Sequence, residues 1–126
     1  MTMPNHIFER YVSELEAFSQ ISYIAPSVTQ ECNDYFDKET GLYDAKFNID
    51  NLFNYLDMLK ERHASIQQLF EDSQDIIERQ DLKQIARLRS HCSSLILLVG
   101  QYRPAYRIDD DYLKTVQTKE EYEKKI

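Results

Sequence analysis

Residues 52–77 read LFNYLDMLKERHASIQQLFEDSQDII, and this stretch carries the clearest structural signal in the chain. Eight of its residues recur at alternating spacings of four and three, the heptad pattern of a helix that packs along one side. They are Leu52, Leu56, Leu59, His63, Ile66, Phe70, Ser73 and Ile77. We call this row the first seam, and it predicts a long helix within a helical bundle. The pattern indicates an architecture rather than a reaction.

Length and composition favour one helical domain. The chain has 126 residues, of which 42% are hydrophobic and 29% are charged, close to the values of ordinary globular domains. Its two glycines and three prolines are too few for the turns of an all-β sandwich, so long helices are favoured. We therefore expect a single all-α domain that spans residues 1–126.

A second apolar row follows the first at helical spacing, and we call it the second seam. It consists of Leu82, Ile85, Leu88, Cys92, Leu95, Val99 and Tyr102. Two helices with matching rows that meet near residue 80 predict an antiparallel pair. With the flanking periodic segments, the sequence predicts helices over 5–24, 27–36, 50–80, 81–102 and 109–124. The predicted fold is an antiparallel bundle of four main helices plus the short helix over 27–36, with a loop over 37–48.

The helix over 50–80 carries a candidate break near residues 71–75. An unbroken helix over this range would span about 46 Å, which exceeds the width of a compact domain of this size. Asp72 and Ser73 favour helix caps, and the carboxylates that follow suit the start of a new helix better than the end of an old one. An elongated molecule with a continuous helix is the alternative.

Charge and hydropathy narrow the choice of partner and compartment. The formal net charge of −7 makes nucleic acid an unfavourable direct partner, because binding phosphates requires a basic face. We expect a protein partner, preferably a basic one, and a homodimer is a further option. The longest apolar run, Leu95 to Val99, is far shorter than the roughly 20 residues that span a bilayer, so we expect no membrane association and a cytoplasmic location. Cys32 and Cys92 follow no metal or redox spacing, which predicts two reduced thiols.

An acidic cluster lies where the two long helices meet. Residues 71–81 contain five carboxylates, with Arg79 as the only base among them. One interpretation is a solvated face whose charges pair with Lys83, Arg87 and Arg89 on the next helix. The other is a docking surface for a cationic protein, whose association such a field accelerates. Four members of the cluster are candidate partner-binding residues, namely Glu71, Asp72, Asp75 and Glu78.

A second candidate binding set surrounds Pro104, after the end of the predicted helix over 81–102. It consists of Tyr102, Arg103, Tyr106 and Arg107. Tyr and Arg side chains dominate the energetics of many protein interfaces, so this segment has the composition of a recognition edge. A plain connection between helices that packs its tyrosines inward is the alternative.

Residues 85–94 read IARLRSHCSS and resemble a stretch of the histidine phosphotransfer domains. Those domains are helical bundles that carry a phosphorylated His on an exposed helix face, so the resemblance implies phosphotransfer through His91. It covers about ten residues. The Lys and Gly that the family places three and four residues after the His are Ser94 and Leu95 here, so the phosphoryl-holding and access-opening residues are missing. A half-buried His beside the seam position Cys92 is the alternative.

The other candidate chemical groups lack the spacings that catalysis or metal binding requires. His63 stands in the first seam, where a core histidine with a hydrogen-bond partner is the favoured interpretation and a pH-responsive one is the alternative. No two histidines stand at i and i+4, and no Glu precedes a His by three residues. There is also no nucleophile elbow or phosphate loop. We therefore expect no metal, no cofactor and no enzymatic activity.

These observations favour a small acidic protein that acts by binding another protein. An inhibitor, immunity or antitoxin-type protein that neutralises a cationic partner is the most specific interpretation, because a compact acidic chain without cofactor suits that task. A secretion chaperone or a structural adaptor subunit shares the same features. Phosphotransfer through His91 is the alternative from a different class.

Overall fold

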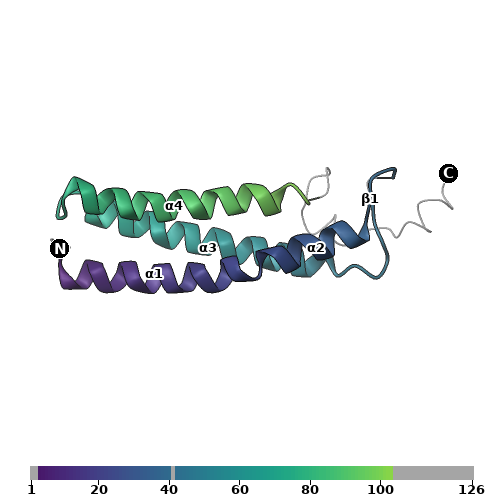
Figure 1. Cartoon of the computed structure of the whole chain (residues 1–126), viewed down its shortest axis with the longest axis horizontal. Helices are drawn as coiled ribbons and strands as arrows, with labels where there is room; N and C mark the ends of the chain where they lie inside the picture. The colour runs from purple at the N-terminus through teal and green to yellow at the C-terminus, as the bar shows by residue number, and fades with distance from the viewer. Residues whose placement is uncertain (1–2, 41, 104–126) are drawn as a thin grey trace.

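Helices dominate the computed structural model, which describes residues 3–40 and 42–103 (Figure 1). The helices are α1 (Asn5–Tyr23), α2 (Ala25–Tyr35), α3 (Ile49–Ser73) and α4 (Arg79–Gly100), and a two-stranded hairpin of β1 (Phe36–Asp37) and β2 (Leu42–Tyr43) lies between α2 and α3. Helix accounts for 77% of the described residues, so the prediction of a mainly helical chain is confirmed. None of the described helices combines the length and the hydropathy needed to cross a membrane.

The first two helices form one bent column instead of two separate elements. Only Ile24 separates α1 from α2, and its backbone is itself close to helical, with φ −90° and ψ −5°. Pro26 falls in the first turn of α2, where a missing N–H breaks no helical hydrogen bond. The predicted start at residue 27 was therefore too late. The part of the chain that the structure describes contains three helical columns, and the predicted helix over 109–124 lies outside it, so four main helices remain a prediction.

The long predicted helix ends at Ser73, within the segment where a break was expected. The carbonyl oxygen of Ser73 accepts hydrogen bonds from the backbone N–H groups of Ile76 and Ile77, at 3.1 and 3.2 Å, and closes the turn to α4. The chain reverses over residues 74–78, slightly before the predicted position near residue 80. The result is an antiparallel α3–α4 pair, with the α1–α2 column lying along α3 (Figure 1).

The two seams supply much of the core. Leu52, Leu59 and Ile66 of the first seam are almost fully buried, and so are Ile85 and Val99 of the second. Only His63, Phe70 and Ile77 of the first seam stay partly exposed, so His63 lies at the border of the core and not within it. The buried faces of α3 and α4 pack against each other, since burial of apolar surface drives helix pairing.

The hairpin corrects the prediction of a loop over 37–48. Phe36 pairs with Tyr43 across the strands, with ring centroids 5.0 Å apart, and Tyr43 stacks on Phe47 at 4.2 Å. The hydroxyl of Tyr43 donates a hydrogen bond to the backbone carbonyl of Tyr102 at 2.5 Å, which ties the hairpin to the end of α4. Two-residue strands are too short to give a period-2 pattern, and so the sequence indicated only a turn.

Candidate functional site

The four predicted acidic residues all lie at the end of the bundle where α3 turns into α4. Glu71, Asp72, Asp75 and Glu78 are each exposed to solvent. The last turn of α3 contains no basic residue, and the unpaired carbonyl groups of a helix C-terminus add partial negative charge. We call these four residues the acidic end. At Glu71 and Asp72 the side-chain and backbone charges have the same sign, whereas Glu78 occupies the N-cap of α4, where the partial charge of the backbone is positive.

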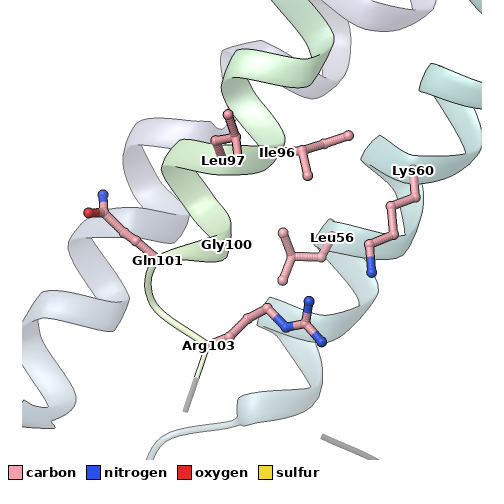
Figure 2. A pocket seen from close by; sticks show the side chains of 7 residues that line it. All are labelled: Leu56, Lys60, Ile96, Leu97, Gly100, Gln101 and Arg103. Atoms are coloured by element: carbon pink, nitrogen blue, oxygen red, sulfur yellow. The ribbon is translucent and has the colours of Figure 1, made fainter. Parts of the chain in front are cut away.

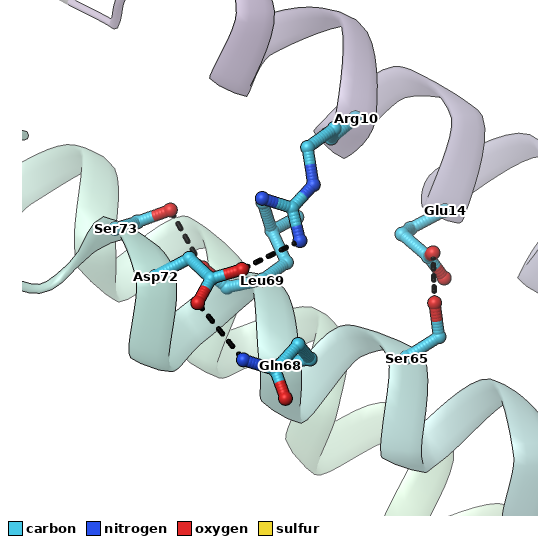
Figure 3. Close-up of polar contacts among 7 residues, drawn as sticks. All are labelled: Arg10, Glu14, Ser65, Gln68, Leu69, Asp72 and Ser73. Carbon is cyan, nitrogen blue, oxygen red and sulfur yellow. Dashed lines mark hydrogen bonds and ion pairs between the residues drawn. The ribbon is translucent and has the colours of Figure 1, made fainter.

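Glu71 accepts a hydrogen bond from Gln67 within α3, and Asp72 is the member of the acidic end that also contacts another helix. One carboxylate oxygen accepts from Gln68 at 2.8 Å, and the other accepts from the guanidinium of Arg10 on α1 at 3.1 Å (Figure 3). The hydrogen bond from Gln68, followed by the one from Arg10, holds the pKa of Asp72 below its ordinary value. This carboxylate therefore links α3 to α1.

The carboxylates of Asp75 and Glu78 form no hydrogen bond or ion pair with any described residue. No base of α4 forms an ion pair with either carboxylate within the described residues, so the interpretation of a face paired with Lys83, Arg87 and Arg89 does not hold for Asp75 and Glu78. The guanidinium of Arg89 lies 4.2 Å from the centroid of the Phe70 ring and donates to Gln67. Within the described residues, neither Lys83 nor Arg87 forms an ion pair with the acidic end.

The second predicted set does not join the acidic end. Tyr102 and Arg103 lie beyond the opposite end of α4, and a helix of 22 residues is about 33 Å long. Tyr102 is half-buried against the core, which favours its interpretation as part of a packed connection. Arg103 is exposed. Tyr106 and Arg107 lie outside the described residues.

A hollow of about 350 Å³ between α3 and α4 is a feature that the sequence did not indicate. Figure 2 shows its lining, which consists of Leu56, Lys60, Ile96, Leu97, Gly100, Gln101 and Arg103. Leu97 is 76% exposed although it is a large apolar side chain. We call this site the α3–α4 hollow. The sequence offers one signal for it, the run of apolar residues at 96–98. Leu97 and Leu98 in this run fall outside the second seam, so packing of that seam does not account for them.

A polar cluster joins α1 to α3 in the middle of the bundle. The two carboxylate oxygens of Glu14 accept from Arg62 at 2.9 Å and from the hydroxyl of Ser65 at 2.5 Å, and Figure 3 shows the second contact. The side chains of Glu14 and Arg62 are only 12% and 29% exposed. These residues stand 48 positions apart in the sequence, so no local pattern could indicate their pairing.

The structure also locates the residues considered for chemistry. His91 is exposed on α4, contrary to the interpretation of a half-buried histidine, while the adjacent Cys92 is fully buried. Burial raises the pKa of the Cys92 thiol to about 11 and also raises that of Cys32, so both thiols are protonated at neutral pH. Among residues 3–40 and 42–103, no three His, Cys, Asp or Glu side chains gather as a metal site.

Comparison with known proteins adds no family to this description. Protein-family models, curated proteins and solved structures each gave no match to the chain. The function must therefore be inferred from the surfaces of the bundle. The acidic end and the α3–α4 hollow are its two distinctive surfaces, and they lie at opposite ends of α4.

Proposed function

We propose that this protein binds a basic protein partner at the acidic end, stoichiometrically and without catalysis. The observation that carries the proposal is the exposure of Asp75 and Glu78, which form no ion pair with any described residue. Glu71 and Asp72 extend the same surface along α3. A group of exposed carboxylates at the tip of a helix pair, of which only Asp72 has an ion pair to a described residue, suits a cationic surface on another protein.

The location of these charges supports a role beyond folding. Glu71 and Asp72, in the last turn of α3, oppose the dipole of that helix, whereas Glu78 at the N-cap of α4 does not. Each opposing carboxylate destabilises a helix by about 0.3–1 kcal/mol at low salt. A chain under selection for stability alone would carry Lys or Arg in the last turn of α3, where none is present. Retaining acidic residues there is therefore consistent with a binding function.

An inhibitor, immunity or antitoxin-type role is the most specific form of this proposal. The net charge of −7 gives the whole chain a field that attracts a cationic effector. Such steering raises the association rate more than it lowers the dissociation rate. A stoichiometric neutraliser benefits from this property, because it must reach its partner before the partner acts.

Charge reversal at the acidic end tests the proposal. The tested variant carries Glu71→Lys, Asp75→Lys and Glu78→Lys and keeps Asp72, because Asp72 holds Arg10. The matched control carries Glu16→Lys, Asp57→Lys and Glu61→Lys, three exposed residues away from the α3–α4 turn. Both variants change the net charge by the same amount, so a difference between them reports the effect of where the charges lie and not of the total charge.

Each chain is used to capture proteins from a lysate of its source cell, and the captured protein is identified by mass spectrometry and purified. We expect the wild type and the control to bind the same basic protein. The acidic-end variant should associate at least about ten-fold more slowly at low salt, with the difference shrinking at high salt. Equal association rates for the two variants would contradict the proposal.

Phosphotransfer through His91 is a second candidate, favoured by one observation. The imidazole is exposed on α4, as a phosphorylated histidine must be. The missing Lys and Gly at positions 94 and 95 weigh against it. Incubation with a small phosphoryl donor should label the wild type and leave His91→Ala unlabelled if this role is correct. Equal labelling of the two chains would exclude it.

A further inference from the structure

We propose that residues 109–116 of this same chain, DDDYLKTV, dock in the α3–α4 hollow. The inference is independent of the proposed function, because the hollow lies at the other end of α4 from the acidic end. It also gives a location to the helix that the sequence predicts over 109–124. Three properties of the described residues carry it: an apolar lining that is partly exposed, two cations without a described partner and the point where the chain leaves α4.

The lining of the hollow is largely apolar, and Leu97 is exposed in it while Ile96 is half-buried and Leu56 is buried. Ile96 and Leu56 project into the space between the two helices, and Leu97, next to Ile96 on α4, is 76% exposed (Figure 2). Covering an exposed leucine with an apolar segment removes its apolar surface from water, which stabilises the folded chain. Leu113 and Val116 of the proposed segment are three residues apart, so both can face one helix groove.

The rim of the hollow carries positive charge on a chain that is otherwise acidic. Lys60 and Arg103 both line it, and neither side chain forms a hydrogen bond or an ion pair with a described residue. Asp109, Asp110 and Asp111 supply three consecutive carboxylates directly before the apolar residues of the segment. The three carboxylates of the segment can therefore pair with the basic rim, while the apolar residues that follow them cover the apolar lining.

The chain leaves α4 beside the hollow. The hydroxyl of Tyr43 holds the carbonyl of Tyr102, and the N–H of Arg103 donates to the carbonyl of Gly100, so the exit point is fixed. Pro104 disfavours continuation of the helix. Residues 104–108 can span up to about 17 Å when extended, enough to bring Asp109 back to Lys60 or Arg103. A tether this short gives an effective concentration in the millimolar range, which favours this segment over that of a second copy.

Disulfide trapping in the full-length chain tests the docking. One variant combines Leu97→Cys with Leu113→Cys, and a second combines Leu97→Cys with Val116→Cys. Each matched control keeps Leu97 and carries Ile76→Cys together with Leu113→Cys or Val116→Cys. Ile76 is an exposed apolar residue beyond the far end of α4. Native Cys32 and Cys92 are buried and do not compete. Disulfides form only where Cα atoms approach within about 7 Å.

Under mild oxidation we expect at least one hollow variant to form an intramolecular disulfide about ten-fold faster than its control, at a rate independent of protein concentration. Adding Lys60→Glu and Arg103→Glu should slow this reaction several-fold, and reversing Asp109, Asp110 and Asp111 to Lys in the same chain should restore it. Rates equal to the controls would overturn the proposal. So would a cross-link between chains that grows with concentration, or a charge-reversed variant that reacts as fast as its parent.

Discussion

At Ser73 the first seam carries a hydroxyl at a fully buried position. The hydroxyl donates to the carbonyl of Leu69 at 2.6 Å, so the buried polar group is satisfied (Figure 3). The residue stands at the last position of α3, where the chain turns toward α4. A small side chain lets the turn close against the core, and its carbonyl then caps the turn through Ile76 and Ile77.

Substitutions at Ser73 should distinguish the contribution of its hydrogen bond to stability from the contribution of its small side-chain volume. Ser73→Ala should change the free energy of unfolding by less than about 1 kcal/mol, because the Leu69 carbonyl keeps its helical N–H partner. Ser73→Leu continues the seam but overfills the site and should destabilise by about 1–3 kcal/mol. Urea denaturation followed by circular dichroism measures both. A more stable Leu variant would show that the turn has room for an apolar side chain.

At the scale of elements, α1 is joined to α3 by two ion pairs of different burial. The pair between Arg10 and Asp72 has side chains that are 42% and 43% exposed, whereas the pair between Arg62 and Glu14 has 29% and 12%. Water screens the first pair and largely leaves the second unscreened. Removal of Glu14 would also leave the Arg62 guanidinium, whose Nε already has no partner, without its main acceptor.

Glu14→Ala should therefore destabilise the protein more than Arg10→Ala. We expect a loss of about 1–3 kcal/mol for Glu14→Ala, since it strands a half-buried charge. The control, Arg10→Ala, breaks an exposed pair between the same two helices and should cost at most about 1 kcal/mol. Thermal and urea unfolding of the three chains give the values. Losses of similar size would mean that Glu14 is as well solvated as Asp72.

For the whole molecule, two buried acids predict a loss of stability in alkali. Burial raises the pKa of Cys92 from 9.0 to about 11, and that of Tyr55 from 10.0 to about 12. The hydroxyl of Tyr55 also donates to the carbonyl of Ile21, a contact made in its protonated form. The unfolded chain loses both protons at a lower pH than the folded chain does. The two groups therefore stabilise the folded state fully below about pH 9, and this contribution disappears as the pH rises to 12.

We expect the free energy of unfolding to fall by about 3 kcal/mol between about pH 8.5 and pH 11 through these two groups, since each unit of pKa difference corresponds to about 1.4 kcal/mol. Urea titrations at several pH values measure the fall. A variant with Cys92→Ala and Tyr55→Phe has a lower starting stability and should lose less of it over this range. An equal fall in both proteins would assign the alkaline effect to other groups.

Local periodicity was sufficient to predict α3, α4 and the break between them, because each depends on residues within a few turns of one another. It was insufficient at Pro26, where the first turn of a helix tolerates proline, and at the β1–β2 hairpin, where two-residue strands leave no pattern. The four residues of the acidic end are exposed, and their role in binding a partner stays a prediction. The sequence did not indicate whether the acidic end and the pair Tyr102 and Arg103 form one site. The structure separates them, because they lie at opposite ends of α4.

The sequence by itself determined that this chain is mainly helical, acidic and built on two apolar seams, because helix period and charge are local or summed properties. Only the tertiary structure decided that Arg10 holds Asp72, that Glu14 holds Arg62, and that an apolar hollow with a basic rim opens between α3 and α4. The two ion pairs join residues 62 and 48 positions apart. Such contacts depend on which helix faces pack together and in which register, and burial over the entire bundle sets both.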